Sequence, residues 1–128
     1  MRRKRPYACG VDVAIDVIDG KWKVLILWAL TTGSKRFGEL KRLVPGVSEK
    51  VLTQQLRELE ADELVSRRTF AEVVPRVEYT LTALGESLNE ALEPLGEWGS
   101  RNQARIETLR SPLSPERVNA VDSGTPGA

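Results

Sequence analysis

Apolar residues recur every three or four positions along most of the chain, which is the spacing of helices with one buried side. The first such segment covers residues 11–18, and aspartates occupy its remaining positions. A second segment, 22–32, is apolar nearly all round, so we expect a buried central helix with Trp22 and Trp28 in the core. A third apolar repeat covers residues 37–44 and predicts another helix.

A tight turn and a capped helix follow. Pro45 and Gly46 stop the preceding helix, and Ser48 is a residue type that commonly caps the next one. We therefore predict a helix over 48–59. Its buried stripe consists of Leu52, Leu56 and Leu59.

The next part of the chain favours strands. Residues 64–72 and 76–81 are enriched in Val, Thr, Phe and Tyr and flank Pro75, which predicts a β-hairpin. Thr82 can then cap a last long helix that continues to Leu109. The apolar stripe of this helix comprises Leu84, Leu88, Ala91, Leu92, Leu95 and Trp98, and Pro94 should kink it.

The order of elements predicts a mainly α-helical fold with one small β-hairpin, a winged helix-turn-helix. Residues 1–8 form a basic N-terminal arm, 9–110 the DNA-binding and dimerisation domain, and 111–128 a Ser-, Pro- and Gly-rich tail that we expect to be disordered. The last helix would be about 42 Å long at about 1.5 Å per residue. Since this exceeds what a small domain needs, part of its apolar stripe should contact a second subunit.

Charge is unevenly distributed on a chain whose net charge is only +1. Residues 35–57 contain six basic and two acidic side chains, whereas 82–109 contain two basic and five acidic ones. A basic region on a nearly neutral protein is a candidate contact surface for a polyanion.

The 48–59 helix carries polar residues opposite its leucine stripe. Thr53, Gln54 and Arg57 lie there with Lys50, and Arg and Gln can make bidentate hydrogen bonds to guanine and adenine. A solvated helix face would have a similar composition, so the residues alone leave both interpretations open. The turn before this helix, the basic helix beside it and the hairpin after it favour DNA.

Other cations around this helix suit the DNA backbone. Lys41, Ser48 and Lys50 can reach phosphates, and Arg76 beside the hairpin turn can enter a narrow minor groove, with a solvated loop charge as its alternative. Lys21 and Lys23 flank Trp22 and either contact phosphates or are solvated.

Composition argues against an enzyme and against a membrane protein. The chain has no histidine, which removes a Ser-His-Asp triad, a Cys-His pair and common zinc sites. We expect no cofactor and no bound metal. The longest apolar run, residues 24–30, is too short to span a membrane, and Asp12 and Asp16 interrupt a signal peptide. With Cys9 as the sole cysteine, we expect a cytoplasmic protein.

Three segments together resemble a known family: DGKWKVLILWAL (19–30), KRFGELKRLVPGVSEKVLTQQLRELEADELVSR (35–67) and PRVEYTLTALGESL (75–88). They are similar to the HxlR-type, MarR-like winged helix-turn-helix regulators of bacteria. The resemblance implies a homodimeric DNA-binding regulator in which the first and last helices form the dimer, residues 48–60 are the recognition helix and the hairpin is the wing. Two-fold symmetry then predicts an inverted-repeat operator.

The resemblance also implies a role for Cys9, because family members commonly carry a cysteine just before the first helix and several use it to sense oxidants or electrophiles. The cations of residues 2–5 would favour the thiolate, whereas Asp12 would oppose it. A lone cysteine is otherwise commonly a small buried hydrophobe. With no second cysteine in the chain, an oxidised form would need Cys9 of the other subunit or a small thiol.

We therefore expect a DNA-binding transcriptional regulator that acts as a homodimer on double-stranded DNA. A small-molecule effector would fit between wing and dimer helices, although no residue set marks such a site. The alternative is a winged helix used only for protein association.

Overall fold

The computed structural model describes residues 6–112. The predicted basic arm lies mostly outside this range, as does the predicted disordered tail beyond Pro112. The chain divides into two compact units, 1–89 and 90–128, each of which is considered by itself.

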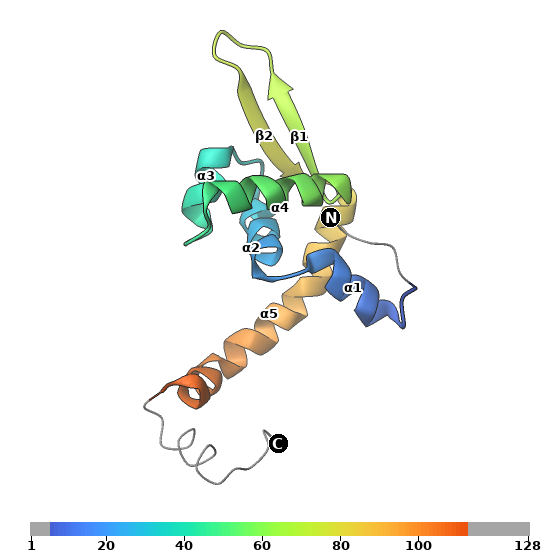
Figure 1. Ribbon diagram of the computed structural model, residues 1–128, viewed down its shortest axis with the longest axis vertical. Helices are drawn as coiled ribbons and strands as arrows, with labels where there is room; N and C mark the ends of the chain where they lie inside the picture. Colours follow the sequence, from blue (N-terminus) through green and yellow to red (C-terminus); the bar gives the residue numbers. More distant parts are fainter. Residues whose placement is uncertain (1–5, 113–128) are drawn as a thin grey trace. The chain divides into compact units, whose positions relative to one another are not determined.

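The observed elements follow the predicted order (Figure 1). They are α1 (Gly10–Ile18), α2 (Lys21–Ala29), a short 3-10 helix η1 (Leu30–Thr32), α3 (Phe37–Leu43), α4 (Glu49–Ala61), β1 (Val65–Phe70), β2 (Arg76–Leu81) and α5 (Ala83–Arg110). The winged helix-turn-helix prediction is confirmed at this level.

Two hydroxyl groups cap helices as predicted. The Ser48 Oγ accepts a hydrogen bond from the backbone N–H of Val51 at 3.1 Å, at the start of α4. The Thr82 Oγ1 does the same for the N–H of Gly85 at 3.0 Å, at the start of α5. Each cap satisfies a backbone donor that a helix N-terminus otherwise leaves free.

The C-terminus of α4 has a feature that was not predicted. The N–H of Leu64 donates to the carbonyl of Leu59, and the N–H of Glu63 donates to that of Glu60, both at 3.0 Å. This is a Schellman motif, whose turning residue is usually glycine. Here Glu63 occupies that position with φ 62°, and it directs the chain from α4 into the hairpin.

The hairpin pairs β1 with β2 in antiparallel register, from Val65 opposite Leu81 to Phe70 opposite Arg76. β1 ends at Phe70, two residues before the predicted end, because 71–75 form the connecting loop. We call β1, β2 and this loop the wing. The backbone of Lys35 adds a single bridge to Tyr79 on β2, with N–O distances of 2.8 and 2.9 Å, which ties the segment before α3 to the wing.

The core of the first unit lies between α2, α3, α4 and the base of the wing. Its fully buried apolar side chains are Ile26, Leu27, Leu30, Leu40, Val44, Val47, Leu52, Leu56, Leu59 and Val65. The predicted leucine stripe of α4 is confirmed. Asn89 near the start of α5 is also buried and donates to the carbonyl of Leu27 at 2.8 Å.

The prediction that α2 is buried all round is wrong. Trp28 is 46% exposed and Leu25 is 40% exposed, while Trp22 is only half-buried. The side of α2 that carries Ile26 and Leu27 packs on the core, whereas the Trp28 side chain is partly exposed to solvent. The apolar sequence of α2 therefore predicted more burial than the other elements of this single chain provide.

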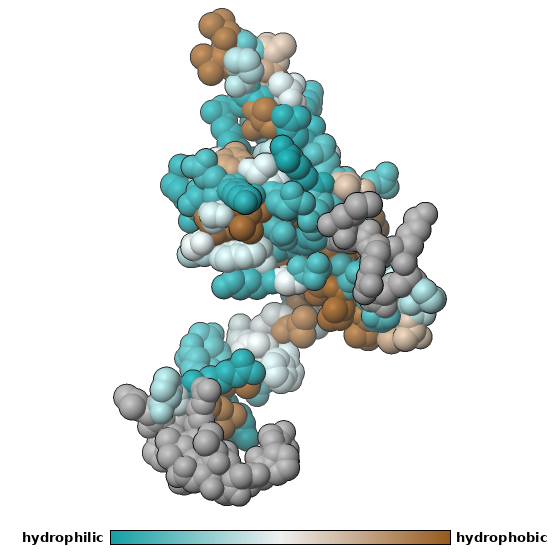
Figure 2. All heavy atoms as spheres, in the orientation of Figure 1, coloured by the Kyte–Doolittle hydropathy of each residue, from teal (hydrophilic) through white to brown (hydrophobic). Residues whose placement is uncertain are grey.

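α1 leaves most of its apolar side chains accessible. Val11 is 71% exposed and Ile15 57%, and the helix contains no fully buried residue. Figure 2 shows hydrophobic atoms at the surface over α1 and at the free end of the wing.

In the second unit, the described residues continue α5 through Pro94 to Arg110. Leu95 is 60% exposed and Trp98 52%, so Trp98 is not a core residue of the described chain. No helix between residues 6 and 112 has the length and hydropathy that a membrane span requires.

Candidate nucleic-acid interface

α3, the turn after it and α4 form the helix-turn-helix. Val44 and Val47 are buried on the two sides of the turn, and Gly46 between them has φ 85°, a conformation that favours glycine. The buried valines hold the turn against the core, so the angle between the two helices is set by packing. α4 is thereby placed with its leucines inward and its opposite side free.

Four residues on the outer side of α4 make up what we call the reading face: Lys50, Thr53, Gln54 and Arg57. Lys50, Gln54 and Arg57 are exposed, and Thr53 is half-buried. Figure 2 shows that hydrophilic side chains dominate the surface around α4. The structure thus brings the three predicted base-reading residues, together with Lys50, to one accessible side of α4.

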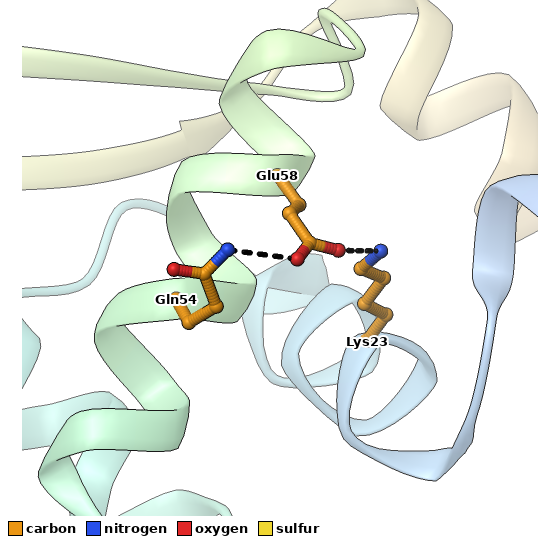
Figure 3. A network of polar contacts seen from close by, with 3 residues as sticks. All are labelled: Lys23, Gln54 and Glu58. Carbon is orange, nitrogen blue, oxygen red and sulfur yellow. Dashed lines mark hydrogen bonds and ion pairs between the residues drawn. The ribbon is translucent and has the colours of Figure 1, made fainter. Parts of the chain in front are cut away.

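Behind the reading face lies a polar network that joins α4 to α2 (Figure 3). The Nε2 of Gln54 donates to Oε2 of Glu58 at 2.9 Å, and the Nζ of Lys23 lies 2.5 Å from Oε1 of the same carboxylate. The Lys23 side chain is fully buried. Both sequence interpretations of Lys23, as a phosphate contact and as a solvated cation, are therefore wrong. Lys21, in contrast, is exposed, with its ammonium 4.4 Å from the ring centre of Trp22.

A hollow of about 320 Å³ separates the reading face from the wing. Thr53 and Arg57 of α4 line one side, and Arg67 of β1 and Tyr79 of β2 line the other. Neither arginine forms an ion pair within residues 6–112. Sequence reasoning missed Arg67 and Tyr79, although two adjacent arginines in a predicted strand were a signal that one would face outward.

The predicted phosphate contacts lie around the start of α4. Lys41 is half-buried in the last turn of α3, and Lys50 is exposed in the first turn of α4. Ser48 is exposed, and its oxygen is occupied as the N-cap acceptor. This cap occupies one backbone amide, and the remaining free amides at the start of α4 point toward any anion in front of the helix.

Arg76 sits at the start of β2 in a more constrained environment than predicted. Its guanidinium lies 3.2 Å from the carboxylates of both Glu72 and Glu78 and 4.1 Å from the ring centre of Phe70. Arg68, exposed on β1, lies 4.8 Å from the same ring. The wing therefore carries two arginines on one aromatic ring, of which Arg76 is already paired with acids.

Apolar residues form the tip of the wing. Val73 is fully exposed, and Val74 is 77% exposed. Neither residue contributes to the core, and their position on the connecting loop leaves them free to contact another molecule.

Cys9 is exposed, directly before the first residue of α1. The alternative of a small buried hydrophobe is therefore wrong. Among residues 6–112, no group of three acidic, cysteine or histidine side chains could hold a metal ion.

Comparison with known proteins places these features in one family. The HxlR-like helix-turn-helix family matches residues 17–107 of this chain. YkvN of Bacillus subtilis (strain 168), described as an uncharacterized HTH-type transcriptional regulator, is 50% identical over 117 residues, which cover 90% of this chain and 99% of YkvN.

Solved structures agree. The reduced form of the redox regulator HypR is 41% identical with a TM-score of 0.73, covering 78% of this chain and 99% of HypR. The HTH-type transcriptional regulator ytcD is 48% identical with a TM-score of 0.70, covering 75% and 98%. The family match runs from the last residues of α1 to the last turn of α5, so the protein belongs to the HxlR-like helix-turn-helix family of transcriptional regulators.

Proposed function

We propose that this regulator binds an inverted-repeat DNA operator as a homodimer, with α4 of each subunit in the major groove and the wing beside it. The observation that carries the proposal is the reading face. Lys50, Gln54 and Arg57 are exposed on a helix whose other side is locked into the core. A recognition helix needs this combination, because base contacts are specific only when the backbone that presents them is fixed.

The residues divide into two roles. Thr53, Gln54 and Arg57 read bases from the groove, with Arg57 suited to guanine and Gln54 to adenine. The phosphate contacts come from the cations and the helix cap that surround this face: Lys41, Ser48, Lys50 and Arg76. Arg76 would have to exchange its acidic partners for a phosphate, so we expect a smaller contribution from it than from Lys50.

Exposed apolar side chains on α1 and α5 support the homodimer. Ile15 and Val11 on α1, and Leu95 and Trp98 on α5, are each more than half exposed. Amphipathic helices with an uncovered apolar side are typical of surfaces that associate. Dimerisation would place two recognition helices about one DNA turn apart.

A gel shift on the DNA upstream of the gene tests this function, at low and at high salt. A shift that weakens with salt and resists competition by unrelated duplex supports the operator. A folded dimer that shifts no duplex at either salt would instead favour the protein-association alternative.

A second property rests on Cys9. We infer that its thiol regulates DNA binding, because it is exposed and the similar protein HypR is a redox regulator. Diamide would take up the two electrons and two protons released when Cys9 forms a disulfide with the partner subunit's Cys9 or with a small thiol. Wild-type protein should then change its DNA affinity on treatment, and Cys9→Ser should not. Equal responses of the two proteins would eliminate thiol sensing.

A further inference from the structure

The network of Lys23, Glu58 and Gln54 differs from a simple surface salt bridge, because one carboxylate contacts both a buried ammonium and an exposed amide. Glu58 uses its two oxygens in opposite directions, Oε1 toward the ammonium of Lys23 and Oε2 toward the amide of Gln54. Figure 3 shows the carboxylate between the two side chains, with the oxygen of Gln54 turned away from it. A buried charge on α2 is thereby connected to an exposed amide on α4.

Burial of the Lys23 ammonium carries a desolvation cost. Its side chain is fully buried, and an apolar residue of similar length would fill the same space without removing a cation from water. Buried ion pairs are weak sources of stability, and some are retained because they fix one arrangement among several. Glu58 of this pair also accepts a hydrogen bond from Gln54, a proposed base-reading residue. The side chain that the pair holds in one arrangement is therefore Gln54.

The carboxylate selects one orientation of the Gln54 amide. An amide has a donor end and an acceptor end, and only the donor end can face Glu58. One N–H of Gln54 is then used by Glu58, and one N–H and the Oε1 remain. A donor and an acceptor side by side are what the major-groove edge of adenine requires.

We propose that Lys23 and Glu58 are positioning residues that preorganise Gln54 for base recognition. Lys23 holds Glu58 from the core, and Glu58 holds the amide of Gln54 in the orientation that reads adenine. The proposal deepens the proposed function and rests on it. It adds that specificity at one base pair depends on two residues that never contact DNA.

The chain contains a matched internal control. In α5, the Nε2 of Gln103 donates to Oε2 of Glu107 at 3.0 Å, with the same four-residue spacing. No cation within the described residues pairs with Glu107. The two glutamines thus differ in whether a buried lysine holds their carboxylate partner.

The first experiment uses this comparison in the wild-type protein without DNA. Side-chain ¹⁵N relaxation should report a more rigid amide for Gln54 than for Gln103. Lys23→Met should lower the order parameter of the Gln54 amide to that of the Gln103 amide. A Gln54 amide as mobile as that of Gln103 in the wild type would overturn the proposal, whether or not any variant folds.

The second experiment measures base preference. Duplexes selected by the wild-type protein from random DNA are changed one base pair at a time, and the ratio of dissociation constants is determined at each position. Gln54→Ala should abolish the preference at one position per half-site. The double variant Lys23→Met/Glu58→Met should lower the preference at that same position about fivefold or more and leave other positions unchanged. It removes one positive and one negative charge, so the electrostatic attraction to DNA is retained.

Controls separate positioning from a general structural effect. In the Gln54→Ala background, the double substitution should have no further effect on that position, since its only route of action is gone. Glu107→Met, which breaks the matching bond in α5, should leave every preference intact. An equal loss at all positions, or none at the Gln54 position, would refute the positioning role while DNA binding by the wild type stands. Failure of the wild type to select any duplex would refute the proposed function itself.

Discussion

Individual side chains of α4 have separate roles, because its leucines are buried while Lys50, Gln54 and Arg57 are exposed. Changes on the reading face should therefore alter recognition with little change in folding. The most informative of these residues is Arg57, which is exposed, forms no ion pair within residues 6–112 and lines the hollow beside the wing.

Arg57→Ala should weaken specific DNA binding by about 1–3 kcal/mol, because a bidentate contact to a base would be lost. Arg57→Lys is the sharper control. It keeps the charge but not the planar fork, so affinity for unrelated DNA should persist while discrimination falls. Titration of both variants with operator and with unrelated duplex distinguishes the two effects. Unchanged discrimination in Arg57→Lys would exclude bidentate reading.

Glu63 offers a test of backbone conformation at a single residue. Its φ of 62° is unfavourable for a side chain with a Cβ, and glycine adopts it without this cost. Glu63→Gly should therefore raise the free energy of unfolding by about 0.5–1 kcal/mol, measured in urea. Glu60→Gly, three residues earlier inside α4, should lower it by about 1 kcal/mol. If both variants lose stability, backbone strain at Glu63 is not the cause.

At the scale of elements, the start of α5 packs closely on the link between α4 and the wing. A Cβ added to Gly85 would lie 2.1 Å from the carbonyl oxygen of Leu64. That carbonyl also accepts the N–H of Thr82 at 3.1 Å, so it cannot move without loss. Gly85 is therefore required by its neighbour and not by its own φ.

Gly85→Ala should destabilise the protein by about 1–3 kcal/mol through this overlap. Gly96→Ala is the matched control, since Gly96 lies in the same helix and has nothing within 4 Å of its Cβ position. There alanine should increase stability by up to about 1 kcal/mol through its helix propensity. Thermal melts of the two variants should shift in opposite directions, and a shared direction would contradict the packing argument.

Local signals predicted most of these elements. Ser48, Thr82 and the Pro45-Gly46 turn act within a few residues, so their helix and turn boundaries could be inferred from sequence. The predictions for Trp28 and Lys23 were wrong because burial depends on which side of α2 faces the core. A helix that is apolar nearly all round does not indicate that side in its sequence. The Lys23–Glu58 pair joins residues 35 positions apart, and no single-chain spacing rule reveals such a contact.

The candidate site divides in the same way. The four residues of the reading face share one helix, and helical geometry predicted their common side. Arg67 and Tyr79 enter the site through the register of the hairpin and its distance from α4, which only the tertiary structure supplies.

At the scale of the whole molecule, the proposed interface is basic on a chain of net charge +1. Counterion release should then dominate the affinity for DNA, and the slope of log affinity against log salt reports how many phosphates the protein neutralises. Lys50→Gln should lower the slope of log affinity against log salt by about one per subunit, hence about two for a dimer. Arg101→Gln, exposed in α5 outside the proposed interface, should leave the slope unchanged. Equal slopes for Lys50→Gln and wild type would remove Lys50 from the phosphate contacts.

The exposed tip of the wing has a consequence for engineering. Residues 71–75 connect the strands without filling any part of the core, and Val73 is fully exposed while Val74 is largely exposed. A loop of this kind tolerates replacement and lengthening at little thermodynamic cost. Libraries randomised over these positions could be screened for new groove preferences on an unaltered scaffold. A fluorophore attached there would report on docking without disturbing the fold.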